Sequence, residues 1–347
     1  MKIDHEKPLV SIVLTLYNGQ RFLAQQLDSI LSQTYKSLEI IVSDDASTDN
    51  GFAIAQSRAE LDERLVLIHH EKNLGLHANL GLALERATGD YIAISDQDDI
   101  WRLDKIEKQL SLLNGSVGIY SDSILIDAEG NNVGATLFES LNIKPREEIT
   151  KTVSLFFKNV VSGHTLLFHR SLLSMVLPFA EDNIFDYQLA LAASCFGGLK
   201  LYPDPLVYHR IHGGNHTNAL LANKSAIKES SAAARSDERQ LHRWLRQQRI
   251  QFVLDRVPRA SKELREYGNL CDEVFLSDIH DLPSEMARYE QVFFNIRLFN
   301  LLRKLGYKHQ YCKKLRFSNC FTLAKGKKWD KLFHLFNRKA GLSVIAK

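Results

Sequence analysis

Short runs of β-branched and other apolar residues alternate with amphipathic stretches through the first 120 residues of the chain. Residues 10–16 form the first apolar run, apolar side chains then recur at helical spacing through 22–31, and residues 38–43 form a second run. Such alternation is typical of βαβ units, in which parallel strands are joined by helices that cover the sheet. We therefore expect an α/β fold built on a mainly parallel, Rossmann-like sheet.

The alternation continues as far as residue 126 and then becomes irregular. It predicts strands at 10–16, 38–43, 65–69, 91–95 and 118–126, and helices at 22–31, 53–61, 75–86 and 105–113. Further along, the pattern predicts a mixed second half, with strands near 153–157, 164–169 and 200–208 and a helix at 187–196. From about residue 219 onward the pattern is helical. We expect one domain at 1–218, with halves at 1–120 and 121–218, followed by a mostly helical region at 219–347.

The composition is that of an ordinary globular protein, with 347 residues of which 45% are hydrophobic and 24% charged. It excludes disordered, collagenous and multi-span membrane classes. No run approaches the roughly 18 apolar residues of a membrane span, and residues 1–8 lack the apolar segment of a signal peptide, so we expect a cytoplasmic protein. The four cysteines lie far apart without a CxxC pair, which indicates free thiols.

Charge is distributed unevenly along the chain. Residues 1–220 hold 18 basic and 28 acidic residues, whereas residues 291–347 hold 14 basic residues and one acidic residue, Asp330. Within this basic tail, residues 325–339 interleave cations with Trp329, Phe333 and other apolar side chains that share one face of a helix. We expect this segment to lie on an anionic membrane surface, the alternative being that it packs on the protein's own core or on a second subunit.

Polar residues follow the ends of several predicted strands, where open α/β sheets bind their ligands. They are Thr15, Tyr17 and Asn18 after the first strand, Asp44, Asp45, Ser47 and Asp49 after the second, and Asp96, Asp98 and Asp99 after the fourth. The segment 43–49 is equally explained as a loop that caps the next helix. Three carboxylates within residues 96–99, however, repel one another unless a cation lies between them. Hard oxygen ligands favour Mg²⁺ or Mn²⁺.

Together these segments resemble the family 2 inverting glycosyltransferases with the GT-A fold, in particular their bacterial rhamnosyltransferase-like branch. The resemblance covers residues 8–218 and rests on VSIVLTLYNG at 10–19, LEIIVSDDASTD at 38–49, NLG at 73–75 and ATGDYIAISDQDDIW at 87–101. It implies that residues 1–120 bind the nucleotide and that 121–218 form the acceptor and catalytic half.

The resemblance also assigns roles to the acidic and aromatic residues of the first half. Positions matching Thr15, Tyr17 and Asp45 hold the nucleotide base in the family, and a carboxylate at Asp45 would favour uracil or thymine. Asp96 matches the residue directed to the ribose or the ion, and Asp98 matches the direct metal ligand. Asp99 is expected to face the donor sugar or acceptor, the alternative being that it caps a helix starting near residue 101.

In the second half, the resemblance places the catalytic base at Asp186, at the start of the predicted helix and after the element Ser162-Gly163-His164-Thr165. The alternative is that Asp186 only offsets the helix dipole. The segment 208–215 resembles a Tyr-Arg-x-His element, in which His212 is the candidate metal ligand and His209 or Arg210 the phosphate partner. Each of these three could instead be a loop residue in solvent.

These assignments predict an enzyme that transfers a sugar, with inversion, from a nucleoside diphosphate donor to a hydroxyl acceptor. The resemblance makes dTDP-rhamnose or a UDP-sugar the expected donor and a cell-envelope glycan or lipid-linked molecule the expected acceptor, without nucleic acid as a partner. Two alternatives stay open: an inactive family member acting as a subunit or scaffold, and a sugar-phosphate nucleotidylyltransferase. The latter class opens with a glycine-rich loop followed by Arg, where this chain has Thr15-Leu16-Tyr17-Asn18. The sequence leaves open whether the protein forms a homo-oligomer.

Overall fold

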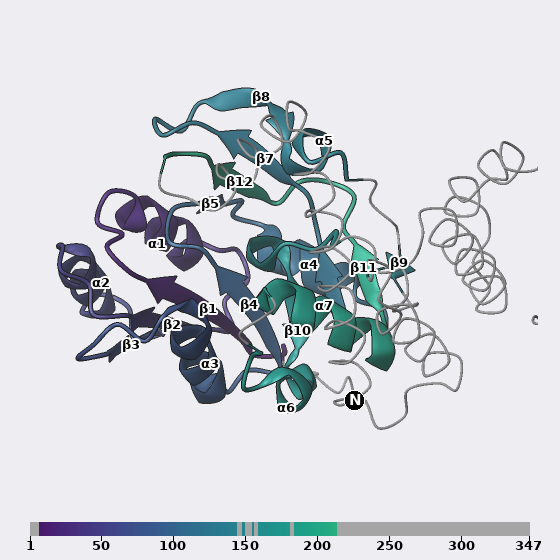
Figure 1. The fold of residues 1–347 in the computed structure, drawn as a ribbon, viewed down its shortest axis with the longest axis horizontal. Helices are drawn as coiled ribbons and strands as arrows, with labels where there is room; N and C mark the ends of the chain where they lie inside the picture. Colours follow the sequence, from purple (N-terminus) through teal and green to yellow (C-terminus); the bar gives the residue numbers. More distant parts are fainter. Residues whose placement is uncertain (1–6, 144–147, 150–154, 156–158, 181–183, 214–347) are drawn as a thin grey trace, which may run out of the picture. The chain divides into compact units, whose positions relative to one another are not determined.

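The computed structural model describes residues 7–143, 148–149, 155, 159–180 and 184–213, all of which belong to one compact unit. The predicted helical region at 219–347, including the basic tail, lies outside the described residues. So does most of the strand expected at 153–157. Figure 1 shows the described part in colour.

Seven of the nine elements predicted for residues 10–126 have both ends within one residue of the prediction, and the helix expected at 53–61 is shifted by two residues. The strands are β1 (Val10–Leu16), β2 (Leu38–Asp44), β3 (Leu65–His69) and β4 (Tyr91–Ser95), and the helices are α1 (Leu23–Leu31), α2 (Gly51–Ala59), α3 (Leu76–Arg86) and α4 (Lys105–Leu112). The periodicity succeeds here because β1, β2 and β4 are buried on both faces and each helix buries one apolar side.

The larger sheet has eight strands in the order β3-β2-β1-β4-β10-β6-β11-β9. Strands β1 to β4 are parallel, β10 (Leu167–His169) runs antiparallel between β4 and β6, and β11 (Leu199–Leu201) is parallel to β6 (Gly118–Tyr120). The edge strand β9 (Glu148–Ile149) is antiparallel to β11. The expected combination of a mainly parallel sheet with a mixed second half is therefore confirmed.

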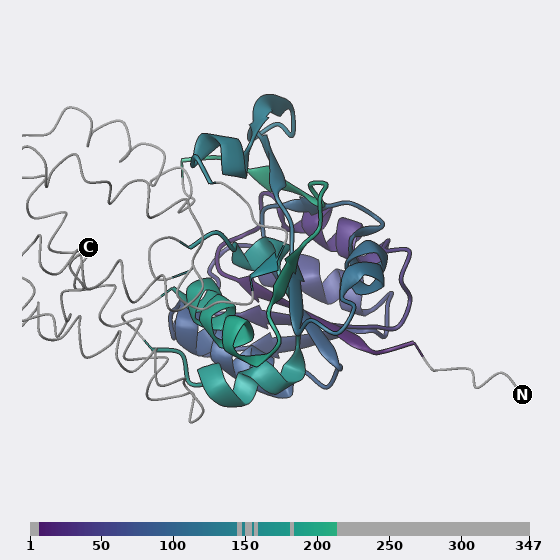
Figure 2. The ribbon, with the colours of Figure 1, turned by 90° about the vertical axis from the view of Figure 1, so that its right-hand side faces the viewer.

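Helices cover both faces of this sheet. Ile12 and Leu14 of β1 belong to one buried cluster with Leu27 of α1 and Ile106 of α4. The alternate side chain Val13 is also buried but points to the other face, where α3 contacts β1 and β2. Figures 1 and 2 show the helices on either side of the strands.

A second, four-stranded sheet has the order β5-β12-β7-β8 and lies at the top of Figure 1. Its strands are β5 (Ile100–Trp101), β7 (Ser123–Ile126), β8 (Asn132–Thr136) and β12 (Val207–Arg210). Short helix α5 (Leu137–Ser140) follows β8 and begins with a capping box between Thr136 and Glu139. The small sheet matters for function because β12 pairs with β5 and so returns to the segment directly after the acidic loop at 96–99.

Three second-half predictions need correction. The single strand expected at 118–126 is two strands, β6 and β7, because the chain leaves one sheet for the other at residues 121–122. The strand expected at 200–208 is likewise divided between β11 and β12, since Pro203 and Pro205 cannot donate ladder hydrogen bonds. The segment expected as a strand at 164–169 begins as the 3₁₀ turn η2 (Gly163–Thr165), and only Leu167–His169 is strand.

The helix expected at 187–196 is α7 (Phe185–Phe196), which starts two residues earlier and takes Asp186 into its first turn. It is preceded by the short helices η3 (Arg170–Leu172) and α6 (Leu173–Val176). None of the helices among the described residues combines the length and the apolar character needed to cross a membrane.

Candidate active site

The register of the parallel strands brings the polar loops to one edge of the sheet. Leu16 is paired with Asp44, and Leu14 is paired with Ser95, so the segments that follow β1, β2 and β4 leave the sheet side by side. Gln97 ties two of these segments together: its side chain accepts a hydrogen bond from Tyr17 N at 2.8 Å and donates one to Tyr17 O at 3.1 Å. These two hydrogen bonds join the loop after β1 to the loop after β4.

The three carboxylates of the acidic loop lie at different depths. The side chain of Asp99 is completely buried, that of Asp98 is 13% exposed and that of Asp96 is 41% exposed. A ligand arriving from solvent therefore meets Asp96 and Asp98 first. Asp99 does not cap a helix near residue 101, because Trp101 belongs to β5 and α4 begins only at Lys105, with Asp104 at its N-cap.

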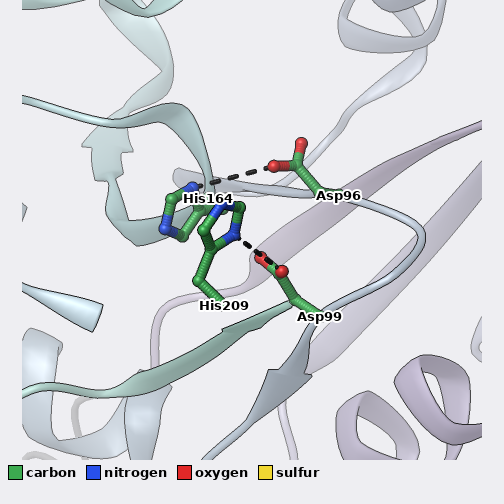
Figure 3. A group of neighbouring side chains, drawn as sticks. All are labelled: Asp96, Asp99, His164 and His209. Carbon is green, nitrogen blue, oxygen red and sulfur yellow. Dashed lines mark hydrogen bonds and ion pairs between the residues drawn. The ribbon is translucent and has the colours of Figure 1, made fainter. Parts of the chain in front are cut away.

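Asp99 pairs with His209 from the returning strand β12. His209 Nδ1 lies 2.8 Å from Asp99 Oδ1, and the same oxygen accepts a hydrogen bond from Arg210 N at 3.1 Å. The His209 ring stacks on that of His164, with 4.3 Å between centroids and 7° between planes. His164 in turn places Nδ1 3.7 Å from Asp96 Oδ2. Figure 3 shows these four residues converging from the acidic loop, η2 and β12.

Electrostatics give the two histidines different charge states. Burial acts to lower the pKa of His209, but the charges of Asp99, Asp96 and Asp98 outweigh it and raise that pKa to about 9. Burial and the positive charge of His209 lower the pKa of His164 to about 3. Burial opposes ionisation of Asp99 as well, yet His209 prevails and lowers its pKa. At neutral pH the pair is therefore Asp99⁻ and His209⁺, beside a neutral His164.

The pKa values of the two more exposed carboxylates, Asp96 and Asp98, are both raised. Desolvation, followed by the charges of Asp99 and Asp98, raises the pKa of Asp96 to about 8. Desolvation and Asp99 likewise raise the pKa of Asp98, although a hydrogen bond with His212 opposes this. His212 Nε2 lies 2.7 Å from Asp98 Oδ2, and its ring packs against Phe22. The sequence named Asp98 and His212 as partners on one metal, and the structure brings them into contact.

The chemistry of this donor set fits a divalent cation. Asp96, Asp99, His164 and His209 each offer a ligand atom within 4.8 Å of the others. Asp98 and His212 add a second, more accessible pair of ligand atoms. Carboxylate oxygens with imidazole nitrogens suit Mg²⁺ and Mn²⁺, Mn²⁺ accepting imidazole more readily.

Asp186 lies in the first turn of α7, beside η2. Its Oδ1 accepts a hydrogen bond from Asn159 Nδ2 at 3.2 Å, and it also receives the backbone N–H groups of Tyr187 and Gly163. Burial outweighs these bonds and raises the pKa of Asp186 to about 7. The charge of Asp186 in turn contributes to the raised pKa of Asp96, which places the two carboxylates in the same electrostatic environment.

The residues expected at the nucleotide base lie at the neighbouring strand ends. Tyr17 is 49% exposed, and Thr15 is half-buried near the end of β1. Asp45 is almost fully buried, and its two carboxylate oxygens accept hydrogen bonds from Leu74 N at 2.7 Å and Gly75 N at 3.0 Å. Asp45 thus fixes the loop before α3, and contact with a base stays a prediction.

The Arg210 side chain is buried, so it does not face solvent as a residue that binds the donor phosphates would. It donates hydrogen bonds to the carbonyl oxygens of Asp98, Asp127 and Ala128 and to Gln25 Oε1, at 2.7–3.1 Å. The guanidinium lies 4.6 Å from the Phe22 ring centroid. This geometry ties α1, the acidic loop and the β7–β8 connection together; a role in donor binding stays a prediction.

Several residues of the site were given no role by the sequence. His164 stood in the quoted element at 162–165 but carried no assignment, and Gln97 and Asn159 were not singled out. Two features of the sequence could have drawn attention to them: the histidine at 164 and the glutamine at 97, which stands between two aspartates. Their contacts join segments that are 80 residues apart for Tyr17 and Gln97 and 41 residues apart for Ser123 and His164. Local pattern cannot reveal such pairs.

Comparison with known proteins places this geometry in a family. The family model described as glycosyl transferase family 2 matches residues 11–177. An uncharacterized glycosyltransferase of Rickettsia prowazekii is 30% identical over 232 residues, which cover 64% of this chain and 70% of that protein. One of Haemophilus influenzae is 23% identical over 335 residues, covering 89% of this chain and 98% of that protein.

Solved structures share the fold. TarS of S. aureus in complex with UDP-GlcNAc has a TM-score of 0.53 at 14% identity, covering 85% of this chain and 81% of that one. The mannosyltransferase PcManGT of Pyrobaculum calidifontis, in complex with GDP-Man and Mn²⁺, has a TM-score of 0.50 at 18% identity, covering 82% and 86% of the two chains. The family match and the Rickettsia relative show that this chain belongs to glycosyltransferase family 2, and the solved structures show that it has the GT-A fold.

Proposed function

We propose that this glycosyltransferase works by inversion, with Asp186 as the general base that takes a proton from the acceptor hydroxyl. The observation that carries the proposal is the position of Asp186: it lies in the first turn of α7, held by Asn159 and Gly163, and close enough to the acidic loop for its charge to act on Asp96. A carboxylate with a pKa near 7 is well matched to proton transfer at neutral pH.

In this mechanism the acceptor oxygen attacks the anomeric carbon from the face opposite the diphosphate as Asp186 removes its proton, and the bond to the diphosphate breaks in the same displacement. Asp98 and His212 would hold a divalent cation, with Asp96 within reach of the donor. Such a cation, when bound, neutralises charge on the departing diphosphate. The presence of all the acidic residues that this chemistry needs favours an active enzyme over a subunit without activity.

The donor is proposed to be dTDP-rhamnose or a UDP-sugar, and the acceptor a cell-envelope glycan or lipid-linked hydroxyl. The choice of a pyrimidine base rests on the resemblance at Asp45, since a carboxylate can accept the N3–H of uracil or thymine. The two solved structures named above hold different nucleotides, UDP-GlcNAc and GDP-Man, so the shared fold alone does not select the base.

The first prediction tests the base. Asp186→Asn should lower kcat by about 10²- to 10⁴-fold with little change in donor affinity, because an amide keeps the shape but cannot accept the proton. In the wild type, kcat/KM should rise with pH through about 7, as Asp186 ionises, and then level off. Rates measured from pH 5 to 9 check both points. Exposed Asp204 provides the control, Asp204→Asn, and wild-type turnover in Asp186→Asn would remove Asp186 from the mechanism.

The second prediction concerns the support of Asp186 by Gly163. A Cβ at Gly163 would lie 2.6 Å from Phe185 Cε2 and 3.6 Å from Asp186 Cβ. Gly163→Ala should therefore displace the start of α7, and a shift of about 1 Å in a catalytic group can cost about 10²-fold in kcat. The measurement is kcat beside the donor Kd, which should stay unchanged.

The matched control for Gly163→Ala is Gly81→Ala in α3, where a Cβ would meet its nearest neighbour, Leu177 Cδ2, at an ordinary 3.7 Å. That variant should keep full activity and gain up to about 1 kcal/mol of stability from the helix propensity of alanine. Equal activity in the two variants would mean that the contact between η2 and α7 does not position the base.

The third prediction concerns the cation. Binding of UDP or dTDP, measured by calorimetric titration with Mn²⁺, should weaken by at least about tenfold when EDTA replaces the metal, and Asp98→Ala should produce a similar loss. Asp28→Ala on the surface of α1 serves as the control, since Asp28 pairs only with Arg58 in the interactions described. Undiminished affinity in EDTA would exclude a metal-dependent donor site.

The fourth prediction concerns the basic tail, which we propose holds the enzyme at the inner face of the cell membrane. Residues 291–347 carry a net charge of +13, and each basic residue near an anionic surface contributes about 1 kcal/mol. The full-length protein should float with anionic liposomes at low salt, and removal of residues 321–347 should abolish flotation. Flotation that persists after truncation would contradict the proposal.

A further inference from the structure

Lys105, in the first turn of α4, is completely buried, and its Nζ has no hydrogen-bond partner among the described residues. The ammonium lies 3.7 Å from the centroid of the Trp101 ring, which is also buried. Burial lowers the pKa of Lys105 to about 7, and the charge of Asp99 opposes this effect, so the ammonium and the Asp99 carboxylate interact.

The groups around Lys105 form a complementary set of unsatisfied donors and acceptors. Besides Lys105 Nζ, the buried side-chain atoms without a partner in the described part of this segment are Trp101 Nε1, Gln109 Oε1 and Asp99 Oδ2. Lys105 and Gln109 are four residues apart and share one face of α4. Gln109 Nε2 donates to Thr165 O at 2.8 Å, next to His164. Two donors and two acceptors are the partners that a buried water molecule requires.

At position 105, an apolar side chain of similar length would cost less folding free energy to bury than an ammonium does. Burying an ammonium without hydrogen bonds costs folding free energy, and replacing such a charge by a hydrophobic side chain is often neutral or stabilising. The packing of α4 therefore does not explain a lysine at 105. Its electrostatic interaction with Asp99 does, because Asp99 is equally buried and its Oδ2 has no hydrogen-bond partner among the described residues.

We propose that Lys105 is a positioning residue for the transfer reaction, acting through Asp99, and that ordered water joins its ammonium to Asp99 Oδ2 and Gln109 Oε1. The inference deepens the proposed function and rests on it. Asp99 Oδ1 holds His209 and the backbone of Arg210, and His212, two residues further along, contacts Asp98. By supporting Asp99, Lys105 would therefore also hold β12 and the candidate metal ligand His212 in place.

The experiment is a double-mutant cycle on Lys105→Met and Asp99→Asn, with Lys108→Met as the matched control. Lys108 lies on the same helix but is partly exposed and pairs with Asp104. Each protein is titrated with UDP and with dTDP in the presence of Mn²⁺, and its unfolding temperature is measured without nucleotide. Lys105→Met should keep or raise the unfolding temperature and weaken nucleotide binding by about tenfold or more. In the Asp99→Asn background the same change should weaken binding by less than about twofold.

Other outcomes overturn the inference. If Lys105→Met binds nucleotide like the wild type, or loses the same factor in both backgrounds, Lys105 does not act through Asp99. If Lys105→Met fails to fold but the double variant folds, that result would support the coupling. If both variants fail to fold, Lys105 has a purely structural role. A wild type that binds neither nucleotide would refute the proposed function, while the unfolding temperatures of the four proteins in the cycle would still reveal whether Lys105 and Asp99 are coupled.

Discussion

The buried pair of Asp99 and His209 is the interaction on which the active site depends. It joins the loop after β4 to strand β12, residues 110 positions apart in the chain, at a distance of 2.8 Å. Both side chains are withdrawn from water, so loss of either partner would leave an unbalanced charge in the protein interior, at a cost of about 3–5 kcal/mol. The small sheet therefore cannot separate from the acidic loop without a large penalty. This connection holds the candidate metal ligands of two distant segments next to one another.

The three aspartates of the acidic loop differ in burial and therefore in what they can contact. Asp99 is engaged with His209 and the backbone of Arg210, which leaves the more accessible Asp96 and Asp98 for ligands. Their pKa values are raised because desolvation and mutual repulsion disfavour a second and third charge beside Asp99. A divalent cation would reverse that balance, since it favours the ionised form of both. The site is thus built to gain stability when a cation binds.

The sequence predicted the elements whose apolar period is local, and it missed the contacts that the tertiary fold creates. Strands β1 and β4 have the predicted boundaries because each is an almost continuous buried run, and the edge strand β3 has them although only Leu65 in it is buried. The division of 118–126 between two sheets was missed, since both parts are apolar and nothing in the period marks the change of partner. In the site, the resemblance named Asp98 and His212 together and the structure brings them into contact, while their role as metal ligands stays a prediction. The stacking of His164 on His209 and the burial of Arg210 depend on the return of β12, which no local pattern specifies.

The 3₁₀ turn η2 links the two chemical functions of the proposed mechanism. His164 of this turn stacks on His209 and lies beside Asp96, while the preceding Gly163 donates its N–H to Asp186 and packs against Phe185. A side chain at 163 would not fit between η2 and α7, so glycine is required by close approach rather than by its backbone angles. The proposed base and the proposed donor site are therefore joined through η2, by the hydrogen bond from Gly163 N–H to Asp186 and by the stacked rings of His164 and His209.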